Sequence, residues 1–129
     1  MKKMDELRTR AEGVYLEETQ FELIPEVIKA LDDVAKFYSY VILFEGDAVY
    51  ECSTGGGEEH DKVHTGKEGL IHSLECWVYT MECNMDDVEQ YRDDYDNPEE
   101  VMATYQSRCQ VLNDYIKTLK HILMNQKGQ

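Results

Sequence analysis

The chain has 129 residues, 42% of them hydrophobic, and a domain of this size buries a core without a metal or a disulfide to hold it. Its 27 acids against 13 bases give a formal charge of -14, which repels phosphate backbones and anionic headgroups, so we expect no direct binding to nucleic acid or membrane. No apolar run approaches the roughly 20 residues that span a bilayer, and no secretory signal follows the basic start, so the cytoplasm is the expected location, with all cysteines reduced.

The first half of the chain reads as two helices. Residues 1–16 form the shorter one, with an apolar edge of Met4, Leu7, Ala11 and Val14. Apolar residues then recur at helical spacing from Ile24 to Cys52, with Pro25 at the entry, which predicts a helix over 24–52.

Residues 38–53 leave a second interpretation open. They are rich in β-forming residues, and Gly46-Asp47 lies at their centre as a hairpin turn. The helix is favoured because Gly46 inside it costs only about 1 kcal/mol relative to alanine, and because an isolated hairpin is only marginally stable. A β-hairpin at 38–53 stays the alternative.

Residues 53–66 contain three consecutive glycines and no apolar periodicity, so they are predicted to be a mobile loop. Two long helices follow. The first spans 70–91 with apolar residues three and four apart, and the second begins at Asn97-Pro98, a typical helix start, and continues to the basic end of the chain. They should pair as an antiparallel hairpin.

The predicted fold is therefore all-α: one domain over 1–129, a bundle of three long antiparallel helices with a short N-terminal helix. The alternative is an α+β fold that contains the hairpin at 38–53.

Charge is concentrated at the turn between the last two helices. Residues 82–100 hold nine acids and one base, Arg92, for a net charge of -8, whereas residues 101–129 hold four bases and one acid, for a net charge of +3. Solvated acids that keep a helix soluble are the common explanation of such a cluster. Tyrosines lie among these acids, however, and tyrosine is enriched at interfaces. The predicted partner-binding residues are Asp86, Asp87, Glu89, Tyr91, Asp93, Asp94, Tyr95, Asp96, Glu99 and Glu100.

This pattern predicts a small acidic binding or inhibitory protein that docks on a basic protein surface. Along a helix the acids fall about every 3 Å, close to the ~3.4 Å phosphate spacing of one DNA strand, which suggests mimicry of nucleic acid toward a nucleic-acid-binding enzyme. In composition the chain resembles the small acidic helical inhibitors that phages use against host nucleases and restriction enzymes.

Other chemistry has weaker support. His60, His64, His72 and Cys76 are zinc-ligand types at four-residue spacings, but no close cysteine pair accompanies them, so we expect neither a metal nor another cofactor. No catalytic motif is present, and the chain is not expected to be an enzyme. The alternatives are a metal-dependent helical nucleotide hydrolase, which requires carboxylates turned inward, and a structural subunit of a homo-oligomer.

Overall fold

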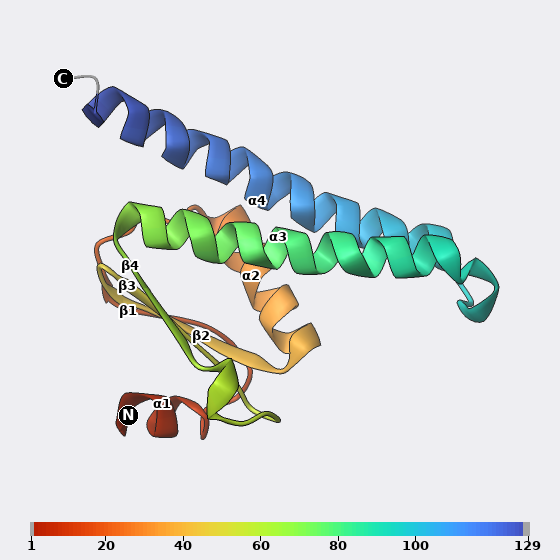
Figure 1. Cartoon of the computed structure of the whole chain (residues 1–129), viewed down its shortest axis with the longest axis horizontal. Helices are drawn as coiled ribbons and strands as arrows, with labels where there is room; N and C mark the ends of the chain where they lie inside the picture. The colour runs from red at the N-terminus through yellow and green to blue at the C-terminus, as the bar shows by residue number, and fades with distance from the viewer. Residues whose placement is uncertain (1, 128–129) are drawn as a thin grey trace. The chain divides into compact units, whose positions relative to one another are not determined.

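The computed structural model describes residues 2–127 and has an α+β fold: a four-stranded mixed sheet and a medium helix are followed by two long helices (Figure 1). The predicted all-α bundle is therefore wrong, and the α+β alternative is the one found. The chain divides into two compact units, the first ending at Ser73 and the second beginning at Leu74. That all 129 residues form one domain stays a prediction, and residues 1, 128 and 129 lie outside the described range.

The sheet belongs to the first unit and has the strand order β1-β2-β3-β4. The first two strands are parallel, because helix α2 (Pro25–Tyr38) connects them, and the remaining neighbours are antiparallel. The strands are β1 (Gly13–Thr19), β2 (Tyr40–Gly46), β3 (Ala48–Ser53) and β4 (Lys62–Thr65).

The segment predicted as the second half of a long helix is the β2-β3 hairpin. Four consecutive residues of β2, Val41 to Phe44, are each at most 1% exposed. Side chains of a strand alternate between the two faces of a sheet, so a sheet covered on both faces buries such a run completely. An amphipathic helix with a single apolar stripe would turn part of the run to solvent. Gly46, with φ +59°, and Asp47 make the two-residue turn that the alternative interpretation expected.

Helix α2 (Pro25–Tyr38) begins at the predicted proline and ends long before Cys52. Ser39 stops it by adopting a left-handed conformation, with φ +60°, and its N–H bonds to the carbonyl of Ala35. The predicted helix over 24–52 is thus correct only in its first half.

The N-terminal prediction is also only partly correct. Helix α1 (Lys2–Leu7) is short, and residues predicted to continue it to Leu16 instead enter β1. Met4 and Leu7 are buried, as expected. The strand β1 forms because β2, which is distant in sequence, supplies its hydrogen-bonding partner, and local periodicity carries no signal of that partner.

Both faces of the sheet are covered within the first unit. Val41, Leu43 and Cys52 form one apolar cluster with Met4 and Leu7 of α1. Ile42 and Phe44 point the other way, toward the side on which α2 lies against β1 and β2 (Figure 1). The sheet is the centre of this unit's core.

The predicted loop over 53–66 is shorter than expected. Residues Glu58–His60 form a 3-10 turn, η1, and Lys62–Thr65 form β4, which pairs with β3. The irregular part is confined to the glycine-containing stretch between β3 and η1. Its mobility stays a prediction.

The two long helices are confirmed. They are α3 (Gly66–Gln90) and α4 (Pro98–Lys127), and the 3-10 turn η2 (Arg92–Asp94) lies between them. The Val101 N–H bonds to the carbonyl of Asn97, as the predicted helix start requires. The expected apolar stripe of α3 is buried at Leu74, Trp77, Val78, Met81 and Val88.

Candidate functional site

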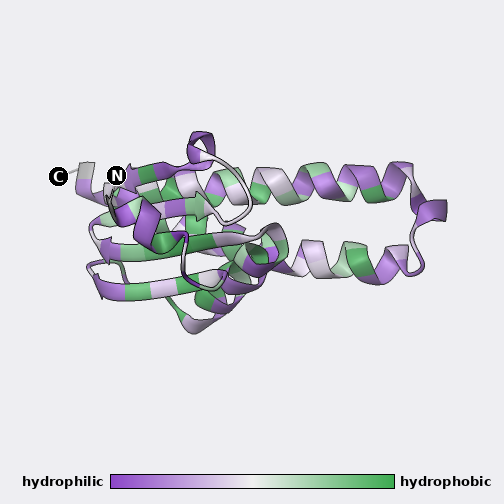
Figure 2. Ribbon diagram, turned by 90° about the horizontal axis from the view of Figure 1, so that it is seen from below, coloured by the Kyte–Doolittle hydropathy of each residue, from purple (hydrophilic) through white to green (hydrophobic). Residues whose placement is uncertain are grey.

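The candidate site is the turn that joins α3 to α4. The two helices pack together in antiparallel directions, and Lys120 Nζ of α4 lies 2.9 Å from Glu75 Oε2 of α3. Figure 2 shows hydrophilic residues gathered at the turn between them. Because the helices reverse here, the end of α3, η2 and the start of α4 come together.

All ten predicted partner-binding residues are exposed in the structure. We call this set the acidic tip: Asp86, Asp87, Glu89, Tyr91, Asp93, Asp94, Tyr95, Asp96, Glu99 and Glu100. Three sit on the last turns of α3, five lie between the helices, and two lie in the first turn of α4. That these residues bind a partner stays a prediction.

Arg92 is the one base among residues 82–100, and it forms two ion pairs. Its Nη1 lies 2.8 Å from Glu89 Oε2, and its Nη2 lies 3.4 Å from Glu99 Oε1. The guanidinium therefore bridges the end of α3 and the start of α4. Exposed ion pairs contribute at most about 1 kcal/mol each.

The remaining acids produce a strongly negative surface. Removing Arg92 and its two partners from the nine acids and one base leaves seven acids with no described base among these residues. Such a surface raises the local concentration of cationic groups and speeds the approach of a basic partner. It also opposes helix formation, since like charges one turn apart repel.

Two tyrosines lie among the acids of the tip. The exposed fraction is 52% for Tyr91 and 38% for Tyr95. With these exposed fractions, neither ring is part of the buried core of the unit. Tyrosine offers a large, stiff contact area with a polar end, and this is the residue character that carries affinity in protein interfaces.

The residues considered for zinc do not form a metal site. His60 is exposed on η1, and Cys76 is half-buried on α3. Only His64 and His72 come together, with ring centroids 5.5 Å apart. Among the residues that the structure describes, no group of three or more metal-ligating side chains has a geometry suited to an ion.

These two histidines belong to a cluster that was not predicted from the sequence. We call it the Glu51 cluster: Glu51, His64, His72 and Ser73. Glu51 is buried on β3, and the hydroxyl of buried Ser73 donates a hydrogen bond to its Oε2. His64 Nε2 lies 3.6 Å from the same oxygen. All four residues belong to the first unit.

Close packing of α3 on β4 makes this arrangement feasible. A Cβ on Gly69 would lie 3.0 Å from the carbonyl carbon of His64 and 3.2 Å from its Cβ. Glycine therefore lets the first turns of α3 approach the strand closely, and Ser73 reaches the carboxylate from one turn further along. The sequence signal was a lone acid inside the β-forming run of residues 48–53.

The surroundings of the Glu51 cluster shift the pKa values of His64 and Tyr40. Burial, followed by the charges of His72 and Lys62, lowers the pKa of His64 below its ordinary value. Burial, followed by the charge of Glu51, raises the pKa of Tyr40 on the adjacent strand.

The geometry suits a structural connection better than catalysis. A serine nucleophile needs a base such as histidine to take its proton. Here the Ser73 hydroxyl bonds to a carboxylate, and the side chain is only 2% exposed. The cluster fastens the start of α3 to β3.

Comparison of the chain with protein families, curated proteins and solved structures finds no match. Within residues 2–127, no helix has the length and apolar character needed to cross a bilayer.

Proposed function

We propose that this protein binds another protein, and that its acidic tip docks on a basic surface of that partner. The observation that carries the proposal is the exposure of all ten tip residues on a turn whose single base is already paired. Exposed carboxylates also favour this proposal over the metal-dependent hydrolase, which requires carboxylates directed inward.

A nucleic-acid-binding enzyme is the kind of partner that fits best. Such proteins carry clusters of lysine and arginine that neutralise phosphates. A dense row of carboxylates competes for those same cations, so the proposed activity is inhibition by occupation of the nucleic-acid site. The partner's affinity should fall as salt rises, because exposed charges are screened.

The chain offers a matched pair of variants for testing the proposal. Asp93 and Asp94 lie in the 3-10 turn η2, and Glu58 and Glu59 lie in the 3-10 turn η1 of the other unit. All four side chains are exposed. Replacing either pair with lysine changes the net charge equally, so a difference in binding reports position and not total charge.

Immobilised wild-type protein, Asp93→Lys/Asp94→Lys and Glu58→Lys/Glu59→Lys are used to capture partners from an extract of the native host. We expect one partner set to bind the wild type and the η1 variant and to be lost from the η2 variant, with circular dichroism unchanged. Equal recovery on all three would refute docking by the tip. Measuring the mass of the isolated protein in solution tests the alternative of a homo-oligomeric subunit.

A further inference from the structure

The N-terminal segment, residues 2–12, is held to the sheet by side-chain contacts. Its helix α1 has six residues, whereas an isolated helix needs roughly 12–15 to be even marginally stable in water. The position of the segment must therefore come from its contacts with the sheet and not from its own helical preference.

The apolar part of those contacts is small. Met4 and Leu7 are its buried members, and they pack on Val41, Leu43 and Cys52. Two side chains anchor the segment, while the remainder of this sheet face belongs to the strands themselves.

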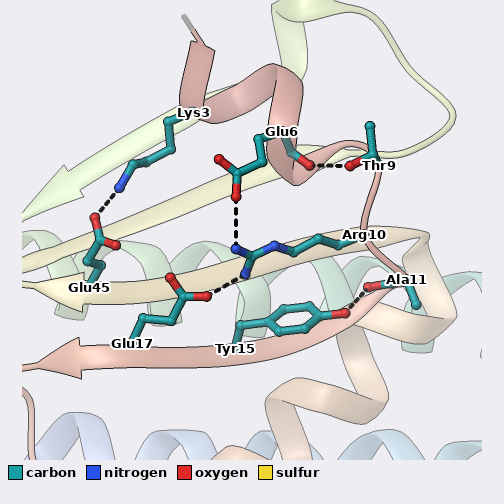
Figure 3. A network of polar contacts seen from close by, with 8 residues as sticks. All are labelled: Lys3, Glu6, Thr9, Arg10, Ala11, Tyr15, Glu17 and Glu45. Atoms are coloured by element: carbon teal, nitrogen blue, oxygen red, sulfur yellow. Dashed lines mark hydrogen bonds and ion pairs between the residues drawn. The ribbon is translucent and has the colours of Figure 1, made fainter.

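The polar part is more extensive, and it connects the segment to three other parts of the unit. Lys3 Nζ pairs with Glu45 at the end of β2. Arg8 Nη1 lies 2.5 Å from Asp61 Oδ1, just before β4, and Arg10 Nη1 lies 2.8 Å from Glu17 Oε1 on β1. Figure 3 shows Lys3 reaching Glu45, and Arg10 reaching Glu17 and Glu6.

Aromatic rings add to the same cationic contacts. Lys3 Nζ lies 4.9 Å from the centre of the Tyr50 ring, and Arg10 Cζ lies 5.0 Å from that of Tyr15. Each of the three cations thus has a carboxylate, and two also have a ring. Their side chains are 20–33% exposed, so dissolved salt reaches and weakens the pairs.

We propose that residues 2–12 form an ionic strap that opens independently of the rest of the first unit, with ionic strength controlling how often it opens. Opening replaces three cation–carboxylate contacts, and the hydrogen bond that the Thr54 hydroxyl donates to Glu12, with water and uncovers the apolar face around Cys52. The sheet beneath keeps its strand pairing, because the strap donates no strand to it.

The cysteines make the opening measurable in the unaltered protein. Cys52 is 0% exposed beneath the strap and reacts with an alkylating reagent only when uncovered. Cys109, 6% exposed in the second unit, reports opening of that unit, and exposed Cys83 reports the intrinsic rate of the reagent.

The test is site-resolved alkylation at pH 8, read by peptide mass spectrometry, in low and in high sodium chloride. After normalisation to Cys83, we expect the Cys52 rate to rise severalfold in high salt while the Cys109 rate stays constant. Arg8→Gln removes the pair with Asp61, together with the pair that Arg8 makes with Asp5 inside the segment, and should raise the Cys52 rate about 5-fold in low salt.

Lys29→Gln is the matched control, because it removes an exposed ion pair with Asp33 on α2, away from the strap. It should leave the Cys52 rate unchanged. A Cys52 rate that responds neither to salt nor to Arg8→Gln overturns the proposal. Cys52 and Cys109 that become reactive together in high salt overturn it as well, since the strap would then open only with the whole molecule.

Discussion

Removing the Ser73 hydroxyl tests whether the Glu51 cluster fastens α3 to the sheet. Ser73→Ala deletes a donor to a carboxyl group that is 5% exposed. Removing a hydrogen-bond donor from a buried acceptor costs about 1–3 kcal/mol, and alanine returns about 0.5 kcal/mol of helix propensity. The net loss in free energy of unfolding should be about 0.5–2.5 kcal/mol.

Urea-induced unfolding followed by circular dichroism measures this loss. Ser107→Ala provides the matched control, because Ser107 is exposed within α4 and should become neutral or about 0.5 kcal/mol more stable. In a Glu51→Met background the hydroxyl has lost this acceptor, so Ser73→Ala should no longer destabilise. If Ser73→Ala behaves like Ser107→Ala, or costs the same in both backgrounds, the reasoning fails.

Two further predictions concern the first unit. The pKa of His64 is lower in the folded chain than its ordinary value of 6.5, so the unfolded chain takes up that proton first as pH falls. The stability that is present above this ordinary value is therefore lost as pH falls through the folded-state pKa. In urea unfolding at a series of pH values, His64→Gln should flatten the decline of stability with falling pH, while exposed His60→Gln should not. An unchanged dependence of stability on pH in His64→Gln would count against the assignment. At the β2-β3 turn, Gly46 has φ +59°, so Gly46→Ala should cost about 1 kcal/mol and lower Tm by roughly 4 °C in thermal unfolding. Gly55→Ala, in an exposed position with open space around it, should not lower Tm, and equal effects of the two changes would contradict the turn geometry.

The helical hairpin was predictable because its signals are local. Periodic apolar residues marked α3 and α4, and Asn97-Pro98 marked the start of the second helix, where the structure begins α4. The acids of the tip were equally visible, since a charged turn between two amphipathic helices has no core to enter.

The sheet was not predictable to the same degree because its pairings are distant. The run Val41 to Phe44 is compatible with a buried helix or with a strand buried on both faces, and the choice depends on α1 and α2 covering both sides. The residues of β1 pair with β2 across the whole of α2. Glu51 was missed for the same reason, because Ser73 and His64 reach it only after β4 and α3 have assembled on β3.

The most direct test of the proposed docking is the affinity of the captured partner for a neutralised tip. Asp86, Asp87, Asp93 and Asp94 are changed together to asparagine, and Kd is measured calorimetrically in low and in high salt. We expect the wild-type Kd to weaken as salt rises, and the variant to bind at least about 100-fold more weakly in low salt, since four interfacial charges are lost. A variant that keeps the wild-type Kd in low and in high salt would contradict docking through the acidic tip.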